Sequence, residues 1–309
     1  MDLDILLQQI LNGLVLGSVY ALVALGYTMV YGILQLINFA HGDVLMVGAM
    51  VGVTVVALLA QSGLPGPVIL VLALLAAIPS CVLLSLFVER IAYRPLRNAP
   101  RLAPLITAIG VSIVIQTVAM IVWKPNPIVF PDLLPTTPIE IGGALLAPKQ
   151  ALILVVSAVM MIGLMLLVNR TKLGRAMRAT AENPRIAGLM GVNANQVIAA
   201  TFAIGAALAA VAGVLVAMNY NIAQFSMGFI PGLKAFTAAV LGGLGNLAGA
   251  VVGGLLLGII ESLGAGYIGD ITGGFLGSHY QDIFAFVVLI VVLVFRPSGI
   301  MGERVADRA

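Results

Sequence analysis

Long apolar segments constrain the fold of this chain more than any other feature. Runs of about 18 or more hydrophobic residues recur along it, and a helix of that length crosses a hydrocarbon core about 30 Å thick. Only 9% of the residues are charged, whereas soluble domains average about 25%. The runs are continuously apolar and do not alternate, which disfavours a β-barrel. The sequence therefore predicts an all-α, polytopic membrane protein.

The expected spans and the absence of long polar segments define a single transmembrane domain over residues 1–309. The segment 232–245 is short, about 20 Å as a helix, so we expect eight or nine spans that include interrupted or half-helices. The N-terminal MDLDILLQQI has no basic residue and does not read as a cleaved signal peptide. The lone Cys81 is expected to be a small buried hydrophobe. Expected spans lie near residues 10–33, 44–60, 67–88, 104–123, 150–168, 196–218, 232–245, 248–268 and 279–295.

Basic residues predict the orientation of these spans. Twelve of the fifteen lysines and arginines fall in three segments, and loops rich in such residues stay in the cytoplasm. The Pro-rich segment 124–149, with Asp132 and Glu140, is expected on the other side. Counting spans from these assignments places the N-terminus outside and the C-terminus in the cytoplasm. The three segments expected in the cytoplasm are 89–103, 170–195 and 296–309.

Small residues recur at every fourth position in several apolar runs, and such stripes let helices approach closely. The sequence carries no G-x-x-x-x-G-K-[ST] phosphate loop, no H-E-x-x-H and no G-x-S-x-G. Two isolated histidines do not make a zinc site. We therefore expect no catalytic residues, no metal and no cofactor. The stripes are Gly13, Gly17 and Ala21; Gly205, Ala209 and Gly213; Gly245, Gly249 and Gly253; and Ala250, Gly254 and Gly258.

Two segments interrupt an apolar run with Gly and Asn: QLINFAHGDVLMVGAMVG (35–52) and KAFTAAVLGGLGNLAGAVVGG (234–254). Broken helices leave backbone groups unpaired, which a membrane tolerates only beside protein or a water-filled cavity. By analogy with secondary transporters, paired breaks point to the transport path. The candidate path residues are Asn38, His41, Asp43, Gly242, Gly243, Asn246 and Glu261.

Two interpretations of the polar stretch NFAHGD remain open. In the structural one, Asn38 caps a helix that begins near Phe39, Asp43 lies in its first turn, and His41 bonds a carbonyl. In the other, these side chains contact a passing solute.

Glu261 also has two interpretations, because an acid at membrane depth tends to be functional. It could carry protons in an ion-coupled transporter, or lie near a helix end and reach solvent. Asp270, His279 and Asp282 are expected to border the outer interface.

The second basic segment predicts two short helices. GRAMRATAEN holds good helix formers, and Asn183 followed by Pro184 starts a second helix that ends near Gly191. The apolar side of this helix suits docking to a partner, or contact with anionic lipid. The candidate coupling residues are Gly174, Arg175, Arg178, Glu182, Asn183, Pro184, Ala187, Gly188 and Gly191.

Four stretches resemble one family. NGLVLGSVYALVALGYTMVYGILQLINFAHGDVLMVGA (12–49) and LKAFTAAVLGGLGNLAGAVVGGLLLG (233–258) resemble specific blocks of the permeases of branched-chain amino acid ABC importers. GRAMRATAENPRIAGLMGVN (174–193) resembles the ATPase-contacting loop of that family, and FRPSGIMG (295–302) fits its C-terminus. These stretches are distributed along the chain from residue 12 to residue 302, and they look like the smaller of the two permeases.

The resemblance implies a subunit of a bacterial inner-membrane importer for leucine, isoleucine and valine. Its partners would be a second permease, two ATP-binding subunits and a periplasmic binding protein, within membrane lipid and without nucleic acid. The 124–149 segment would then be periplasmic, and 170–195 would couple ATPase closure to the helices. The urea and short-amide branch of the family has similar blocks, and an ion-coupled transporter that uses Glu261 is the alternative from another class.

Overall fold

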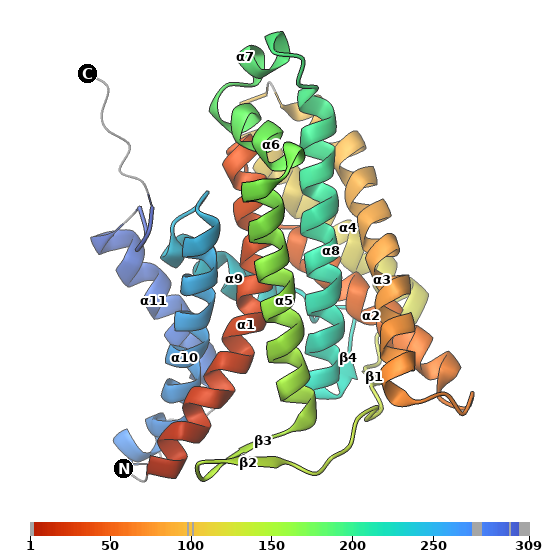
Figure 1. Ribbon diagram of the computed structural model, residues 1–309, viewed down its shortest axis with the longest axis vertical. Helices are drawn as coiled ribbons and strands as arrows, with labels where there is room; N and C mark the ends of the chain where they lie inside the picture. Colours follow the sequence, from red (N-terminus) through yellow and green to blue (C-terminus); the bar gives the residue numbers. More distant parts are fainter. Residues whose placement is uncertain (1–2, 98, 101, 274–279, 297, 303–309) are drawn as a thin grey trace.

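The computed structural model describes residues 3–97, 99–100, 102–273, 280–296 and 298–302, and these form a helical bundle (Figure 1). Seven of the described helices are long and apolar enough to cross a membrane. Two shorter apolar helices, α9 (Phe229–Gly242) and α11 (Gln281–Phe295), complete the apolar set of the described chain. The prediction of an all-α membrane protein with a half-helix is confirmed. The long helices are α1 (Leu3–Leu34), α2 (His41–Leu59), α3 (Gly66–Val88) with its short extension, α4 (Leu102–Trp123), α5 (Pro148–Arg170), α8 (Ala194–Tyr220) and α10 (Leu247–Ile271).

Two small antiparallel sheets lie near one end of the bundle (Figure 1). β2 (Ile139–Ile141) and β3 (Ala144–Leu146) form a hairpin whose turn is Gly142–Gly143, with φ values of 58° and 89°. Two positive φ angles match the tight turn that right-twisted strands favour. β1 (Ile128–Val129) pairs with β4 (Ile222–Ala223). These strands were not expected from the sequence. We call this end of the molecule the hairpin end.

Two short helices, α6 (Lys172–Glu182) and α7 (Pro184–Leu189), occupy the opposite end, which we call the α7 end (Figure 1). The expected basic loop near residue 89 is largely helical there, because the π-helix Glu89–Tyr93 and the 3-10 helix Arg94–Leu96 extend α3. Glu89 is buried and forms an ion pair with Arg97, and Tyr93 is almost fully buried. Residues 98 and 101 of that segment, and 297 and 303–309 of the C-terminal one, lie outside the described residues.

The small-residue stripes of α1 and α10 pack against each other; the sequence predicted close helix approach at these stripes but not which helices meet. Gly17 lies so close to α10 that an added Cβ would be 2.8 Å from the carbonyl oxygen of Gly254. Gly258 in turn faces Gly13 and Gly17 at a distance that admits no Cβ. This contact makes α1 a central helix, since most of its middle is buried. Tight small-residue contact is how helices associate where water provides no hydrophobic drive.

The first helix break lies between α1 and α2, where residues 35–40 are irregular. The expected Asn38 cap is wrong: α2 begins at His41, and its N-cap residue Ala40 provides no side-chain hydrogen bond. Asn38 instead accepts a 2.7 Å hydrogen bond from the Tyr93 hydroxyl. This bond satisfies the buried side-chain oxygen without a helix N-terminus. Asp43 lies in the first turn of α2, as expected.

The second break separates α9 from α10 at residues 243–246. Asn246 caps α10 through the Gly249 N–H at 2.9 Å and also donates to the Met301 carbonyl at 2.9 Å. Gly32, near the end of α1, lies beside Gly245, since a Cβ on Gly32 would sit 3.7 Å from the Gly245 Cα. The two breaks are therefore neighbours in space.

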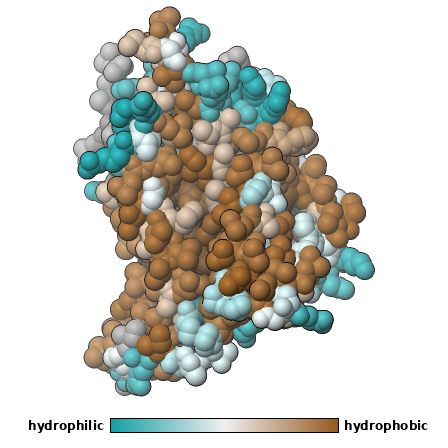
Figure 2. Space-filling model, turned by 45° about the vertical axis from the view of Figure 1, so that its right-hand side comes forward, coloured by the Kyte–Doolittle hydropathy of each residue, from teal (hydrophilic) through white to brown (hydrophobic). Residues whose placement is uncertain are grey.

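The outer helices expose apolar side chains. Most of α4 and α5 is exposed, and α4 presents Ile106, Ile113, Val118 and Ile121 on its surface. Figure 2 shows a broad hydrophobic surface between two ends that carry hydrophilic residues. Such a band is typical of a lipid-facing or subunit-facing surface.

Candidate functional site

Two adjoining cavities enter the bundle beside α4 and α9. The larger one, of about 840 Å³, is bounded by α1, α4, the end of α8, the connection to α9 and the start of α11. The smaller one, of about 250 Å³, reaches the start of α2. Ile109, Ser112 and Phe229 line both cavities. The two spaces are therefore continuous or separated by a thin wall of side chains.

The small cavity ends at a buried carboxylate. Asp43 and Gly42 of α2 line it together with Tyr27. Asp43 is only 2% exposed, and its Oδ1 accepts a 2.8 Å hydrogen bond from Gln116 Nε2. This hydrogen bond ties α4 to α2, and Gln116 also donates to Ser112 of its own helix at 3.3 Å.

A cluster of charges forms one wall of the large cavity. Lys234 Nζ lies 2.5 Å from Glu261 Oε1 and 2.6 Å from Asp282 Oδ1. The Tyr20 hydroxyl donates to Glu261 Oε2 at 3.1 Å and accepts from Lys234 at 3.3 Å. Lys234, Asp282 and Tyr20 line the cavity, whereas Glu261 stands behind them.

The solvent interpretation of Glu261 is wrong. Glu261 is 1% exposed and lies well inside α10. Its charge is balanced by Lys234, a residue that the sequence reasoning missed. A usable signal existed: Lys234 and Glu261 are opposite charges in neighbouring apolar runs, and such residues tend to pair. Asp282 has a half-exposed side chain that is bound to Lys234, and His279 lies outside the described residues.

The other expected path residues lie away from the cavities. His41 is 3% exposed and packs edge-on against Tyr27, with ring centroids 4.9 Å apart. Nε2 of its buried ring has no hydrogen-bond partner among the described residues. The ring fills the space over Gly26, so it faces packed helices. Asn38, Gly243 and Asn246 belong to the two helix breaks, Gly242 ends α9, and of the expected set Asp43 alone lines one of these two cavities.

The α6–α7 segment matches its predicted local structure. Asn183 caps α7 by accepting from the N–H groups of Arg185 at 3.0 Å and Ile186 at 3.1 Å. Ala187 is buried, whereas Leu189 is 87% and Met190 81% exposed. The apolar side of α7 is therefore divided between an inner contact and a free surface.

The remaining expected coupling residues have different surroundings. Gly174 and Arg178 hold α6 against the end of α5, since Arg178 donates to the Val168 carbonyl. Arg175 and Glu182 point to the surface. Pro184 opens α7, Gly188 has open space around it, and Gly191 has a φ of 85°.

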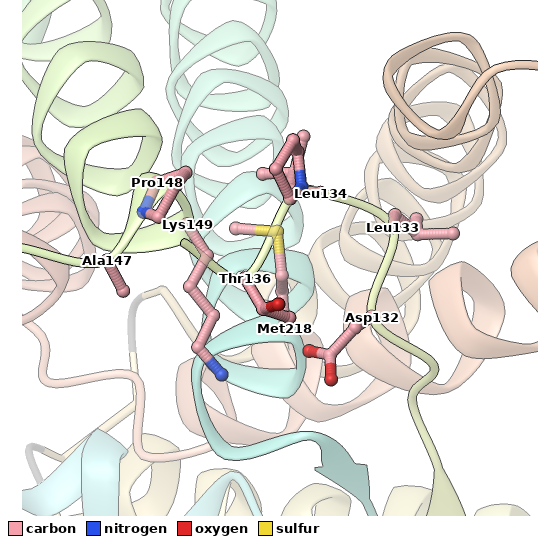
Figure 3. Close-up of a pocket in the computed structure, with 9 residues that line it drawn as sticks. Asp132, Leu133, Leu134, Thr136, Ala147, Pro148, Lys149 and Met218 are labelled. Atoms are coloured by element: carbon pink, nitrogen blue, oxygen red, sulfur yellow. The ribbon is translucent and has the colours of Figure 1, made fainter. Parts of the chain in front are cut away.

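A small pocket of about 230 Å³ lies at the hairpin end, where the 124–149 segment meets α8 (Figure 3). Lys149 and Asp132 reach toward the same opening (Figure 3). Asn221 joins them, because it accepts from Lys149 Nζ at 2.9 Å and donates to Asp132 at 3.1 Å. This bridge fixes the connecting segment on the end of α8.

Long apolar helices that enclose two adjoining cavities are an architecture found in membrane transport proteins. The chain belongs to the family described as branched-chain amino acid transport system, permease component, whose family model matches residues 9–293. It is thus a non-catalytic, multi-pass subunit of an ABC transport system, and this membership implies ATPase and binding-protein partners in general.

The chain is similar over its whole length to curated permeases. It is 48% identical to the high-affinity branched-chain amino acid transport system permease protein BraD of Pseudomonas aeruginosa, over 98% of this chain and 97% of that one. It is 44% identical to LivH of Escherichia coli, with the same coverage. The solved PsaBC complex of Streptococcus pneumoniae with Fab matches at 14% identity and a TM-score of 0.42, over 96% of this chain and 91% of that chain. This last likeness is too low to define the fold.

Proposed function

We propose that this chain is the smaller permease subunit of a bacterial inner-membrane importer for leucine, isoleucine and valine. The observation that carries the proposal is the identity of 48% and 44%, over 98% of the chain, to two permeases of high-affinity branched-chain amino acid transport systems. The partners would be a second permease, two ATP-binding subunits and a periplasmic binding protein. The α7 end would face the cytoplasm, because basic residues of 89–103 and 170–195 gather there. The hairpin end, with the N-terminus, would face the periplasm.

The two cavities supply a path for the substrate in this proposal. An amino acid released by the binding protein at the hairpin end would enter the large cavity and pass Ser112 and Phe229 toward Asp43. The adjacent helix breaks, at residues 35–40 and 243–246, would lie on the side toward the α7 end. Both apolar and polar side chains line the path, among them Ser112, Gln116 and Lys234.

The α7 helix supplies the contact with the ATPase. Its exposed Leu189 and Met190 give a small apolar surface of the kind that docks into a groove. α7 is followed by α8, which Asn193 caps and which ends at Tyr220 on the large cavity. A displacement of α7 would therefore reach the cavity through one rigid helix.

Uptake by the reconstituted system tests the proposal. Vesicles that contain this chain, its second permease, both ATPases and the binding protein should accumulate radiolabelled leucine only when ATP is supplied. Accumulation of urea in place of leucine would assign the chain to the urea and short-amide branch. Uptake by this chain alone, driven by a proton gradient, would support the ion-coupled transporter.

A further inference from the structure

We propose that Lys234 and Asp282 form a binding site for the two charged ends of a free α-amino acid in the large cavity. The carboxylate of the ligand binds the Lys234 ammonium, and the ammonium of the ligand binds the Asp282 carboxylate. The proposal rests on the proposed function and names the side chains that recognise the substrate class within the permease itself.

The charge cluster has a fixed side and a movable side. Glu261 is 1% exposed and is held by both Lys234 and Tyr20. The Asp282 side chain is 41% exposed and belongs to the first turn of α11. Its ion pair with Lys234 joins α11 to α9 at the cavity wall. Glu261 and Tyr20 therefore hold the Lys234 ammonium in place, while Asp282 is free to turn away from it.

The three donors of Lys234 are all engaged, by Glu261, Asp282 and Tyr20. A ligand carboxylate reaches Nζ only when it takes the place of Asp282. The displaced carboxylate then needs a cation, and an α-ammonium a few ångströms from the ligand carboxylate supplies it. One ion pair is thus exchanged for two, with no net charge added to the membrane interior.

This exchange selects zwitterions. Lys234, Glu261 and Asp282 together carry a net charge of −1 when all are ionised. A ligand without an ammonium would add a second negative charge beside two carboxylates, which is unfavourable in a low-dielectric site. A ligand without a carboxylate cannot bind Lys234. If it drew Asp282 away, Lys234 would lose that partner and gain none in return. Neutral urea offers neither group.

The rest of the cavity suits an apolar side chain. Val19, Ile113, Val216 and Ile230 line it from four different segments. Its volume of about 840 Å³ falls within the range of about 300–1,000 Å³ that is usual for small-molecule sites. Because the ligand competes with an ion pair that already exists, binding is weak, as a transit site requires.

Cysteine protection tests the site in the assembled permease and ATPase complex, without binding protein. Cys81 is fully buried, so Ser226→Cys on the cavity wall provides a single accessible thiol in this chain. We expect L-leucine to slow its alkylation with half-protection in the millimolar range. Leucinol, which lacks the carboxylate, and 4-methylpentanoate, which lacks the ammonium, should need a concentration at least about tenfold higher.

Variants assign the effect to the charged pair. Asp282→Asn should raise the leucine concentration for half-protection by about tenfold, and Asp282→Glu should restore protection because it keeps the carboxylate. Glu140→Gln is the matched control, since Glu140 is an exposed carboxylate of β2 at the same end of the molecule. It should leave protection unchanged.

Three results would overturn the site: no protection by leucine, equal protection by leucinol, or full protection in a folded Asp282→Asn variant. Leucine uptake by vesicles of the complete system is measured alongside. ATP-driven uptake without protection refutes the site and leaves the importer standing, whereas vesicles that take up no leucine refute the importer itself.

Discussion

At the scale of single residues, the most consequential contact is the buried pair of Lys234 and Glu261. The two side chains are 5% and 1% exposed and lie 2.5 Å apart. Removing one partner of a buried ion pair leaves an uncompensated charge, which lowers the free energy of unfolding by about 3–5 kcal/mol. Loss of transport in a Glu261→Gln variant therefore does not by itself reveal a proton-carrying acid, because it also leaves Lys234 without its inner partner.

A charge-removal series tests this pair. Lys234→Met should lower the thermal unfolding midpoint of the detergent-solubilised protein, because the free energy of unfolding falls by about 3–5 kcal/mol. The double variant Lys234→Met/Glu261→Gln should recover most of that loss, since no buried charge then lacks a partner and Asp282 stays half-exposed. Equal destabilisation of the single and double variants would show that the ion pair is not what stabilises this wall.

At the scale of elements, α7 combines a capped N-terminus with an apolar surface that nothing in the described chain covers. Its N-terminus is satisfied by Asn183, and its inner side by the buried Ala187. Leu189 and Met190 find no cover within the described chain, since both are more than four-fifths exposed. A partner at this end would bury them.

A Leu189→Asp substitution tests docking at this element. It should leave the thermal unfolding midpoint unchanged, because Leu189 is 87% exposed. ATP-driven leucine uptake in vesicles should fall by at least about tenfold, as expected for a residue central to an interface. Leu189→Met is the matched control and should keep near-normal uptake. Normal uptake with Leu189→Asp would place the ATPase contact elsewhere.

At the scale of the whole molecule, the two ends differ in chemistry. The α7 end gathers the basic side chains of the extension of α3, of the end of α5 and of α6, including Arg90, Arg94, Arg170 and Lys172. The hairpin end carries Asp132 and Glu140 as well as Lys124 and Lys149. The excess of Lys and Arg at one end is what sets the orientation of a membrane protein.

Accessibility of introduced thiols tests this orientation. In cells whose outer membrane is permeable, a membrane-impermeant maleimide should label Leu145→Cys on β3, which is 52% exposed. Leu189→Cys should react only after the inner membrane is opened. The unsubstituted chain is the control, because its one cysteine is buried. The reverse pattern would invert the assignment of the two ends.

The sequence by itself determined the helices, their approximate ends and the two breaks, because these follow from hydrophobic run length and from local residues. Asn183 with Pro184 predicted α7, and the small-residue stripes of α1 and α10 predicted that each helix has a close neighbour, without saying which one. The tight Gly142–Gly143 turn was also encoded locally but was not recognised as a hairpin.

Only the tertiary structure decided which polar groups meet. Tyr20 and Glu261 are 241 residues apart in the chain, and Lys234 and Glu261 are 27 apart. Asn38 is a residue type that can cap its own helix, but its side-chain oxygen instead accepts a hydrogen bond from Tyr93 of another helix. Hydropathy and helical period fix where a helix lies in a membrane, but they leave its rotation and neighbours open. Those are settled by packing of the whole bundle, and only then do the cavities and their charged wall exist.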